Sequence, residues 1–346
     1  MISRVADGCF WLTRYLERVD SLARLLDVHH ALHIDSGVAS RQRWRPLVVV
    51  AGEEADFLVR IGADALEDGE AVQEYLTWDT QHPSALFSAV RGARENARSV
   101  REIMSLEAWE AINDLWLWMR GREARRLYQR NRAAFYERLI QSTVLFHGVA
   151  YGTMLHDEPF SFMKLGRAVE RAGQTARIVG AHGPGDDAGT DAGAEATHWL
   201  AVLRSCCAFD PFFRGARPLR RDAVIRFLVF DRSFPRSVLY NLDEARTLLW
   251  MLRRDDPRGM PRRSRSALER LRGELLQMDV ADVERRGLRS TLAWVVDSTA
   301  QLCDAIHDDY LDPPMAWLRH CVRVLESLEP DLESDLEPAP GEHRAA

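Results

Sequence analysis

The chain has 346 residues, of which 46% are hydrophobic and 28% charged, and its formal net charge is −6. This composition is typical of a folded globular protein and excludes a disordered chain, while the negative charge argues against broad nucleic-acid binding. No apolar stretch reaches the roughly eighteen residues that a transmembrane helix needs, and the first residues lack the apolar core of a signal peptide. We therefore expect a protein that has no membrane partner.

The cysteine and lysine contents argue against two further kinds of chemistry, metal binding and a lysine nucleophile. The five cysteines form no Cys-x-x-Cys pair, which favours a reducing cytoplasm, and His29 and His33, four apart on one helical face, lack a third ligand of suitable spacing, so no metal or cofactor is expected. Lys164 is the only lysine beside 45 arginines, so a lysine nucleophile has a single candidate. Codon bias is the simplest reason for the many arginines, but guanidinium groups also make bidentate contacts to carboxylates and phosphates.

Hydrophobic residues recur with a helical period along nearly the whole chain. Leu47 to Ala51 is an apolar run that a strand would also show, but the residues after it favour short helices over 44–62. Pro83 suits the first turn of a helix that continues to about residue 102, and Ser105 is a predicted N-cap for the next one. Further helices are predicted over about residues 3–33, 70–79, 124–156, 159–182, 196–209, 219–230, 235–254, 264–279, 288–309 and 314–327.

Two segments interrupt this pattern. Residues 183–195 are rich in Gly, Asp and Ala, which predicts a flexible linker, and the acidic, Pro-containing residues 328–346 predict a disordered tail. Few segments alternate between apolar and polar residues as strands do. The sequence therefore predicts the all-α class, as a multi-helix bundle in one domain over residues 1–327.

An internal repeat is the clearest motif in the chain. Residues 12–25 and 165–178 both fit the pattern Leu-x-Arg-x-x-Glu-Arg-x-x-x-x-Ala-Arg-apolar, which predicts two pseudo-equivalent helices. A Glu-Arg dipeptide alone is common in this sequence, so the signal lies in the repetition of the whole pattern. Its charged positions are Arg14, Glu17 and Arg18 in the first copy and Arg167, Glu170 and Arg171 in the second.

On a helical wheel, Arg18 and Arg171 fall within the apolar arcs of their helices. Burying a guanidinium without an acceptor costs several kcal/mol, so two interpretations stay open. In one, each Glu accepts from the Arg of the other copy in a buried network that joins the two helices. In the other, the excess of Arg over Glu forms a polar pocket for a carboxylate or phosphate, and Asp7 or Asp20 neutralises part of the charge.

Two further charged segments are candidate parts of the same pocket. Residues 91–98 carry alternating charges on a helix, where surface ion pairing is the alternative interpretation. Residues 231–238 indicate a turn into a helix, with Ser233 as N-cap and Pro235 in the first turn, where an anion or a simple cap would fit. The candidate binding residues in these segments are Arg94, Glu95, Asn96, Arg232 and Arg236.

Several separated segments occur together in one order, at residues 3–6, 11, 14–18, 23–26, 94–98, 148–154, 165–172, 199–205 and 234–238. In this combination the chain resembles the alpha-E family, bacterial all-helical proteins with a repeated Glu-Arg motif. The resemblance covers roughly residues 1–325. One departure is Gly173, which stands where the family more often has an acidic residue, so the two copies are not expected to be strictly symmetric.

The resemblance implies a companion of circularly permuted ATP-grasp ligases, and of transglutaminase-like proteins, in making or handling a peptide or amide-bonded product. The signature arginines would then bind an anionic group of a peptide, an amino acid or a carrier for the ligase. Two alternatives remain: a stand-alone transferase or hydrolase with Glu17 or Glu170 as general base, or a structural scaffold without a ligand.

Overall fold

The computed structural model describes residues 3–36, 44–52, 54–182, 192–252 and 262–311, and every regular element within these ranges is a helix. The predicted all-α class is therefore confirmed. The first half of the chain contains α1 (Ser3–Ser36), α2 (Arg45–Ala51), α3 (Glu54–Arg60), α4 (Gly69–Trp78), α5 (Leu86–Ser99), α6 (Leu106–Met119), α7 (Arg122–Arg130) and α8 (Arg132–Thr153). The second half contains α9 (Glu158–His182), α10 (Ala192–Ser205), α11 (Phe209–Arg214), α12 (Arg221–Ile225), α13 (Val238–Met251), α14 (Arg263–Leu276), α15 (Val280–Arg286) and α16 (Leu288–Ile306).

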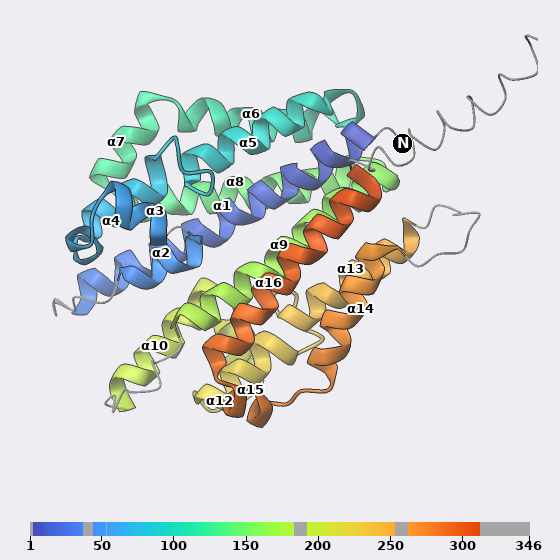
Figure 1. The fold of residues 1–346 in the computed structure, drawn as a ribbon. Coiled ribbons are helices and arrows are strands. Elements are labelled where there is room, and N and C mark those ends of the chain that lie inside the picture. The colour runs from blue at the N-terminus through green and yellow to red at the C-terminus, as the bar shows by residue number, and fades with distance from the viewer. Residues whose placement is uncertain (1–2, 37–43, 53, 183–191, 253–261, 312–346) are drawn as a thin grey trace, which may run out of the picture.

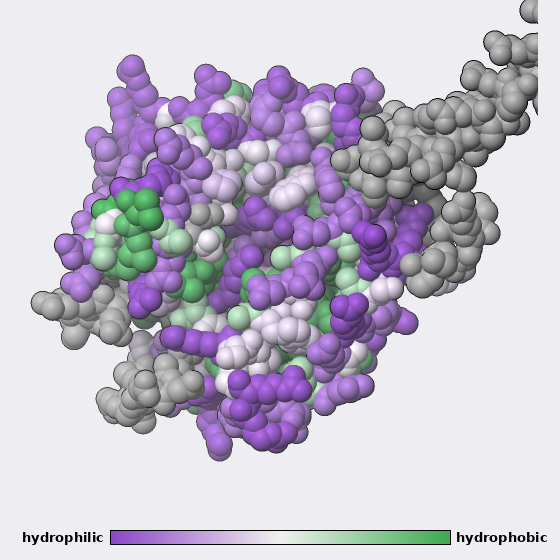
Figure 2. Space-filling view, viewed as in Figure 1, coloured by the Kyte–Doolittle hydropathy of each residue, from purple (hydrophilic) through white to green (hydrophobic). Residues whose placement is uncertain are grey.

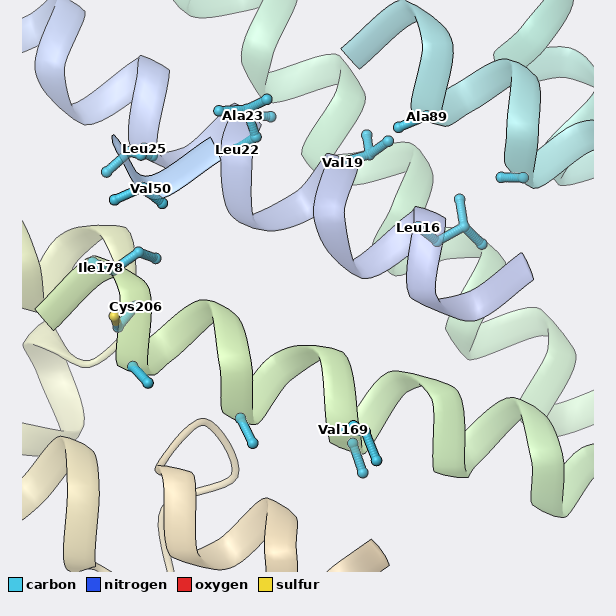
Figure 3. Packing of buried hydrophobic residues seen from close by; sticks show 14 of the residues in the cluster. Leu16, Val19, Leu22, Ala23, Leu25, Val50, Ala89, Val169, Ile178 and Cys206 are labelled. Carbon is cyan, nitrogen blue, oxygen red and sulfur yellow. The ribbon is translucent and has the colours of Figure 1, made fainter. Parts of the chain in front are cut away.

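The helices α1 and α9, which carry the two copies of the repeat, pack along each other through the middle of the molecule (Figure 1). They run parallel, because residues about 153 positions apart meet along their length. Leu25 and Ile178 lie at one end of the close-up in Figure 3, and Leu16 and Val169 lie farther along the same two helices. The repeat in the sequence is thus an approximate twofold relation in space.

The rest of the fold follows the same duplication. In the first half α1 packs on α5 and α8, and α6 packs on the same two helices. In the second half α9 packs on α13 and α16, and α14 covers that pair. The molecule is therefore two similar four-helix units joined through α1 and α9, with the smaller helices filling the margins (Figure 1).

The turns that lead into α5 and α13 show the duplication at atomic detail. Asp79 Oδ1 accepts hydrogen bonds from the backbone N–H groups two and three residues on, at 2.7 and 2.9 Å. Asp231 Oδ1 does the same at 2.8 and 3.1 Å. A proline follows each aspartate four residues later, at Pro83 and Pro235, so Ser84 and Arg236 occupy equivalent places.

The hydrophobic core is one connected cluster that runs through both halves, as the close-up in Figure 3 shows around α1 and α9. Its largest fully buried side chains include Trp199, Tyr136 and Phe10. Burial of this apolar surface is the main source of stability for such a helical protein. In the described part of the chain, no helix combines the length and the apolar run needed to cross a membrane.

Several expected helix boundaries were wrong for identifiable reasons. The helix expected over 124–156 is broken at Asn131, whose extended backbone and side chain, accepting from the Ala134 N–H at 3.0 Å, cap α8. Pro83 lies in the turn before α5 and not in its first turn, because that helix begins at Leu86. Ser105, in contrast, is confirmed as the N-cap of α6.

The remaining expectations concern the linker, the tail and the segment before α13. Residues 192–195 of the expected linker are helical, because α10 begins at Ala192, and residues 183–191 lie outside the described residues. The helix expected over 314–327 and the tail over 328–346 lie outside them as well. Ser237, and not Ser233, is the N-cap of α13, and the short helices α11 and α15 were not predicted.

The closest approach of α1 and α9 yields a first prediction. A Cβ at Gly166 would lie 2.2 Å from the Phe10 carbonyl oxygen, so α1 would have to move. We expect Gly166→Ala to lower the free energy of unfolding by about 2 kcal/mol or more, measured by urea unfolding. Gly148→Ala is the matched control, since no atom lies within 4 Å of its Cβ. It should instead gain about 0.5–1 kcal/mol from helix propensity, and equal midpoints for the two variants would contradict the contact.

Candidate functional site

The charged residues of the two repeats meet where α1 and α9 cross. Arg18 Nε donates to Glu170 Oε1 at 2.7 Å, and Arg171 donates to Glu17 through Nε and Nη2, both at 2.7 Å. Each glutamate therefore accepts from the arginine of the other copy. Glu17 is 1% exposed and Glu170 is 3% exposed, so these are buried ion pairs that hold the two helices in register.

Glu170 is the acceptor on one side of the crossing. Arg14 Nε donates to its Oε2 at 2.9 Å, and the side-chain amide of Gln174 donates to its Oε1 at 2.9 Å. Burial opposes ionisation of Glu170, but the charges of Arg18 and Arg14 outweigh burial and hold its pKa well below the usual range. The carboxylate is thus fully ionised and fully bonded at neutral pH.

Glu17 and Asp20 are the acceptors on the other side. Arg236, at the start of the second half's α13 region, bridges them, with Nη2 2.6 Å from Asp20 Oδ2 and Nη1 3.4 Å from Glu17 Oε1. Arg24 Nε also donates to Asp20 at 3.1 Å, and Thr143 Oγ1 donates to it at 3.3 Å. Burial opposes ionisation of Asp20, yet Arg236 and Arg24 lower its pKa to about 2.

The structure thus contains the buried network that was one of the two interpretations. It also contains the excess of positive charge on which the pocket interpretation depended, because two guanidinium groups remain outside the network. Within the described residues, Arg167 and Arg177 make no hydrogen bond or ion pair. The crossing as a whole brings together three carboxylates, Glu17, Asp20 and Glu170, and seven guanidinium groups, Arg14, Arg18, Arg24, Arg167, Arg171, Arg177 and Arg236.

The internal repeat explains why Arg167 is left over. Arg167 is the counterpart of Arg14, so symmetry would pair it with Glu17. Arg236 reaches Glu17 instead, whereas the equivalent place in the first half holds Ser84, which has no charge. Burial, together with the charge of Arg171, lowers the pKa of Arg167. A desolvated cation beside other cations is an energetic cost that an anionic ligand would relieve.

Arg177 is left over for a different reason. Its counterpart Arg24 pairs with Asp20 one helical turn earlier, but Gly173 stands at the place of that aspartate in α9. The glycine lets α16 approach closely, since a Cβ there would lie 3.2 Å from Thr299 Oγ1. The close packing of α16 on α9 thus favours a glycine at residue 173, and Arg177 lacks the carboxylate that Asp20 supplies to Arg24.

His147 of α8 adds a neutral polar group beside the first free guanidinium. Its Nε2 is buried and has no hydrogen-bond partner among the described residues. Burial and the charges of Arg167 and Arg171 keep the pKa of His147 well below its usual value. We call the group formed by Arg167, Arg171, Arg236 and His147 the Arg167 recess.

The other predicted site residues lie apart from this network. Arg94 Nη1 contacts Glu95 Oε1 at 2.7 Å, and the Asn96 side chain donates to the Gly92 carbonyl at 2.8 Å, so these residues are engaged within α5. Arg232 is exposed and pairs with Asp243. Of the two arginines predicted before α13, only Arg236 therefore joins the crossing.

Several members of the crossing were missed as candidates. Arg24 and Arg177 were present in the repeat pattern as its last arginine, so the sequence did hold a signal for them. Thr143 and His147 had no such signal, because each lies in a helical stretch without a motif, and Gln174 falls at a variable position of the repeat pattern. Among the described residues, no group of His, Cys, Asp and Glu side chains is placed to hold a metal ion.

Taken together, fold and site define an all-helical protein built from two similar four-helix units, whose first helices exchange buried Glu–Arg pairs. A family model for Alpha-E, a predicted alpha-helical domain with a conserved ER motif, matches residues 1–311. The chain belongs to the Alpha-E family.

Similar proteins occur in mycobacteria, and none of them has an assigned activity. The chain is 24% identical over 328 residues to uncharacterized proteins of Mycobacterium bovis and Mycobacterium tuberculosis. The alignment covers 88% of this chain but 36% of each relative, so the chain spans about a third of their length. No solved structure matches the fold.

The exchanged ion pairs predict a non-additive response to substitution. Glu17→Leu leaves Arg171 buried without its acceptor, so we expect a loss of about 3–5 kcal/mol in the free energy of unfolding. Glu17→Leu combined with Arg171→Met should recover most of that loss, because an apolar pair replaces a charged one. Chemical denaturation of the single and double variants measures this. Losses that simply add would contradict the pairing.

The low pKa of Asp20 predicts acid sensitivity. The pKa falls from 3.8 to about 2 in the folded protein, so the ionised carboxylate stabilises the fold above about pH 4, and this contribution is lost as the pH falls toward 2. Its size is about 2 kcal/mol. We expect the stability difference between wild type and Asp20→Asn to shrink over this range in thermal melts. A difference independent of pH would argue against the ion pairs of Asp20.

Proposed function

We propose that this protein is a helical partner of an ATP-grasp-type peptide or amide ligase, and that the Arg167 recess holds an anionic group of a peptide, an amino acid or a carrier. The observation that carries the proposal is the Arg167 guanidinium, which lies beside the signature network without an acceptor among the described residues. Guanidinium groups are seldom desolvated without one, because the cost is several kcal/mol.

An anion in this recess would find complementary groups already in place. Arg171 and Arg236 are fixed by Glu17 and Asp20, so their remaining N–H groups cannot collapse onto other acceptors. His147 Nε2 supplies one more polar atom, and a bound anion would favour protonation of its ring. Preorganised donors of this kind bind carboxylates and phosphates through charge-assisted hydrogen bonds.

The glutamates of the repeat support the arginines and do not suit a catalytic role. Glu170 has a strongly lowered pKa, which makes it a poor general base at neutral pH. Both oxygens of Glu17 accept from Arg171. A stand-alone transferase or hydrolase that uses either glutamate is therefore the weaker candidate. A pure scaffold is also weaker, because it gives no reason for the unpaired Arg167.

The ligase and a transglutaminase-like protein are proposed as partners on the family resemblance, which associates alpha-E proteins with both. The relatives are much longer than this chain, which supports action together with a further protein or domain. We place the protein in the cytoplasm, and the support is that the described cysteines, Cys9, Cys206, Cys207 and Cys303, are free thiols.

Ligand binding is tested by titration calorimetry with inorganic phosphate, N-acetylglutamate and an acidic dipeptide. We expect at least one of these to bind, and Arg167→Gln to weaken that binding about tenfold or more. Arg232→Gln is the matched control, because that arginine is exposed and lies outside the network. Indistinguishable titrations for folded wild type and Arg167→Gln would remove the recess from the proposal.

The partner role has its own test. The purified protein is added to an ATP-grasp ligase from the same cell, and ADP release is followed with peptide or amino-acid acceptors. We expect a lower KM for the acceptor in the presence of the wild type but not of Arg167→Gln, because the recess would position the acceptor. Amide formation by the chain alone, lost in Glu170→Gln, would favour the enzyme alternative instead.

A further inference from the structure

A groove of about 970 Å³ lies on the opposite side of the crossing, between α2, α9 and α16. These three helices lie next to one another in Figure 1, and Figure 2, from the same side, shows apolar residues exposed in the hollow between them. Val49 of α2 lines one wall, and Leu292 and Val296 of α16 line the other. Gly180 of α9 also lines the groove and has no side chain to fill it. The volume is within the range of sites that bind small molecules and short peptides.

The second free guanidinium, that of Arg177, lines this groove. Burial lowers the pKa of Arg177, and the charges of Arg18 and Arg14 act in the same direction. The charge of Glu170 raises the pKa of Arg177, but both oxygens of Glu170 already accept from Arg14 and Arg18. Arg177 therefore faces the groove with donors that have no acceptor among the residues that the structure describes.

The first copy of the repeat shows what is absent here. In α1 the equivalent guanidinium of Arg24 contacts both oxygens of Asp20, at 3.1 Å each from Nε. In α9 Gly173 takes the place of that aspartate, and the groove opens beside Arg177. A carboxylate supplied from outside would restore the pair that the first copy makes internally.

We propose that this groove binds the C-terminal carboxylate of a short apolar peptide, with Arg177 pairing with the carboxylate and Val49 and Val296 contacting the apolar side chains. The site extends the proposed function by giving a peptide ligand a second anchor, but it uses different residues from the Arg167 recess. Either site can therefore fail without the other.

The lining of the groove favours a peptide carboxylate over a phosphate ion. Arg45 is occupied by Glu54 at 2.6 Å, Arg289 has an interaction of its own, and Asp297 adds a negative charge to the same lining. The guanidinium of Arg177, which has no acceptor among the described residues, matches a monoanionic carboxylate in bidentate geometry. The apolar walls add contact area that a phosphate ion would not use.

The test uses the full chain and fluorescence anisotropy with a labelled tetrapeptide, Gly-Ala-Leu-Leu, carrying either a free C-terminal carboxylate or a C-terminal amide. We expect the carboxylate form to bind about tenfold or more tightly than the amide, which is the effect of one charged hydrogen-bonded pair. Arg177→Gln should abolish this difference. Arg24→Gln is the matched control, since its guanidinium already has a carboxylate partner, and it should keep the difference.

A second variant supplies the absent carboxylate from α9 itself. Gly173→Asp places a carboxylate one turn before Arg177, and Thr299→Ala in the same chain removes the side-chain oxygen that lies 3.2 Å from the new Cβ. We expect this folded double variant to lose the preference for the carboxylate peptide, whereas Thr299→Ala alone should keep it.

Three results would overturn the proposal. The first is that the wild type binds neither peptide, and the second is that it binds both equally. The third is that Arg167→Gln loses the carboxylate preference while Arg177→Gln keeps it. That third result would place the peptide carboxylate in the Arg167 recess and would leave the proposed function standing.

Discussion

The fold depends on the exchange of buried charges between α1 and α9. Glu17 and Glu170 are almost completely buried, so each needs a cation close at hand, and each finds it on the other helix in Arg171 or Arg18. A shift of one helix by a single turn would leave two carboxylates and several guanidinium groups buried without partners. The pairs therefore fix the parallel register of α1 and α9. This register sets the position of the two four-helix units relative to each other.

The functional interest lies in where the duplication is imperfect. Arg236 has Ser84 as its counterpart, and Asp20 has Gly173, so the two sides of the crossing differ at these two charged positions. Each difference leaves one guanidinium without an acceptor among the described residues, Arg167 on one side and Arg177 on the other. In the proposals made above, these two guanidinium groups become two chemically different anion sites, one polar and one bordered by apolar walls.

The structure contains the buried network, and the proposed pocket uses the arginines that this network leaves without a partner among the described residues. The paired arginines hold the two helices together, and the free guanidinium groups of Arg167 and Arg177 lie beside these neighbours of like charge. In the proposed function, the structural ion pairs support the binding site, as the residues behind the ligand-contacting side chains do in preorganised sites generally. One short sequence pattern would then specify both stability and anion binding.

Local sequence determined the helices, the Ser105 cap, the repeat and the possibility of exchanged Glu–Arg pairs, because periodicity and capping depend on neighbours a few residues away. It did not determine that Asn131 would end one helix and start another, or that Arg236 rather than Arg232 would reach Glu17. It also gave no sign of His147 beside Arg167. These features depend on how helices more than a hundred residues apart pack against one another, and only the tertiary structure decides which buried charge finds a partner and which is left without one.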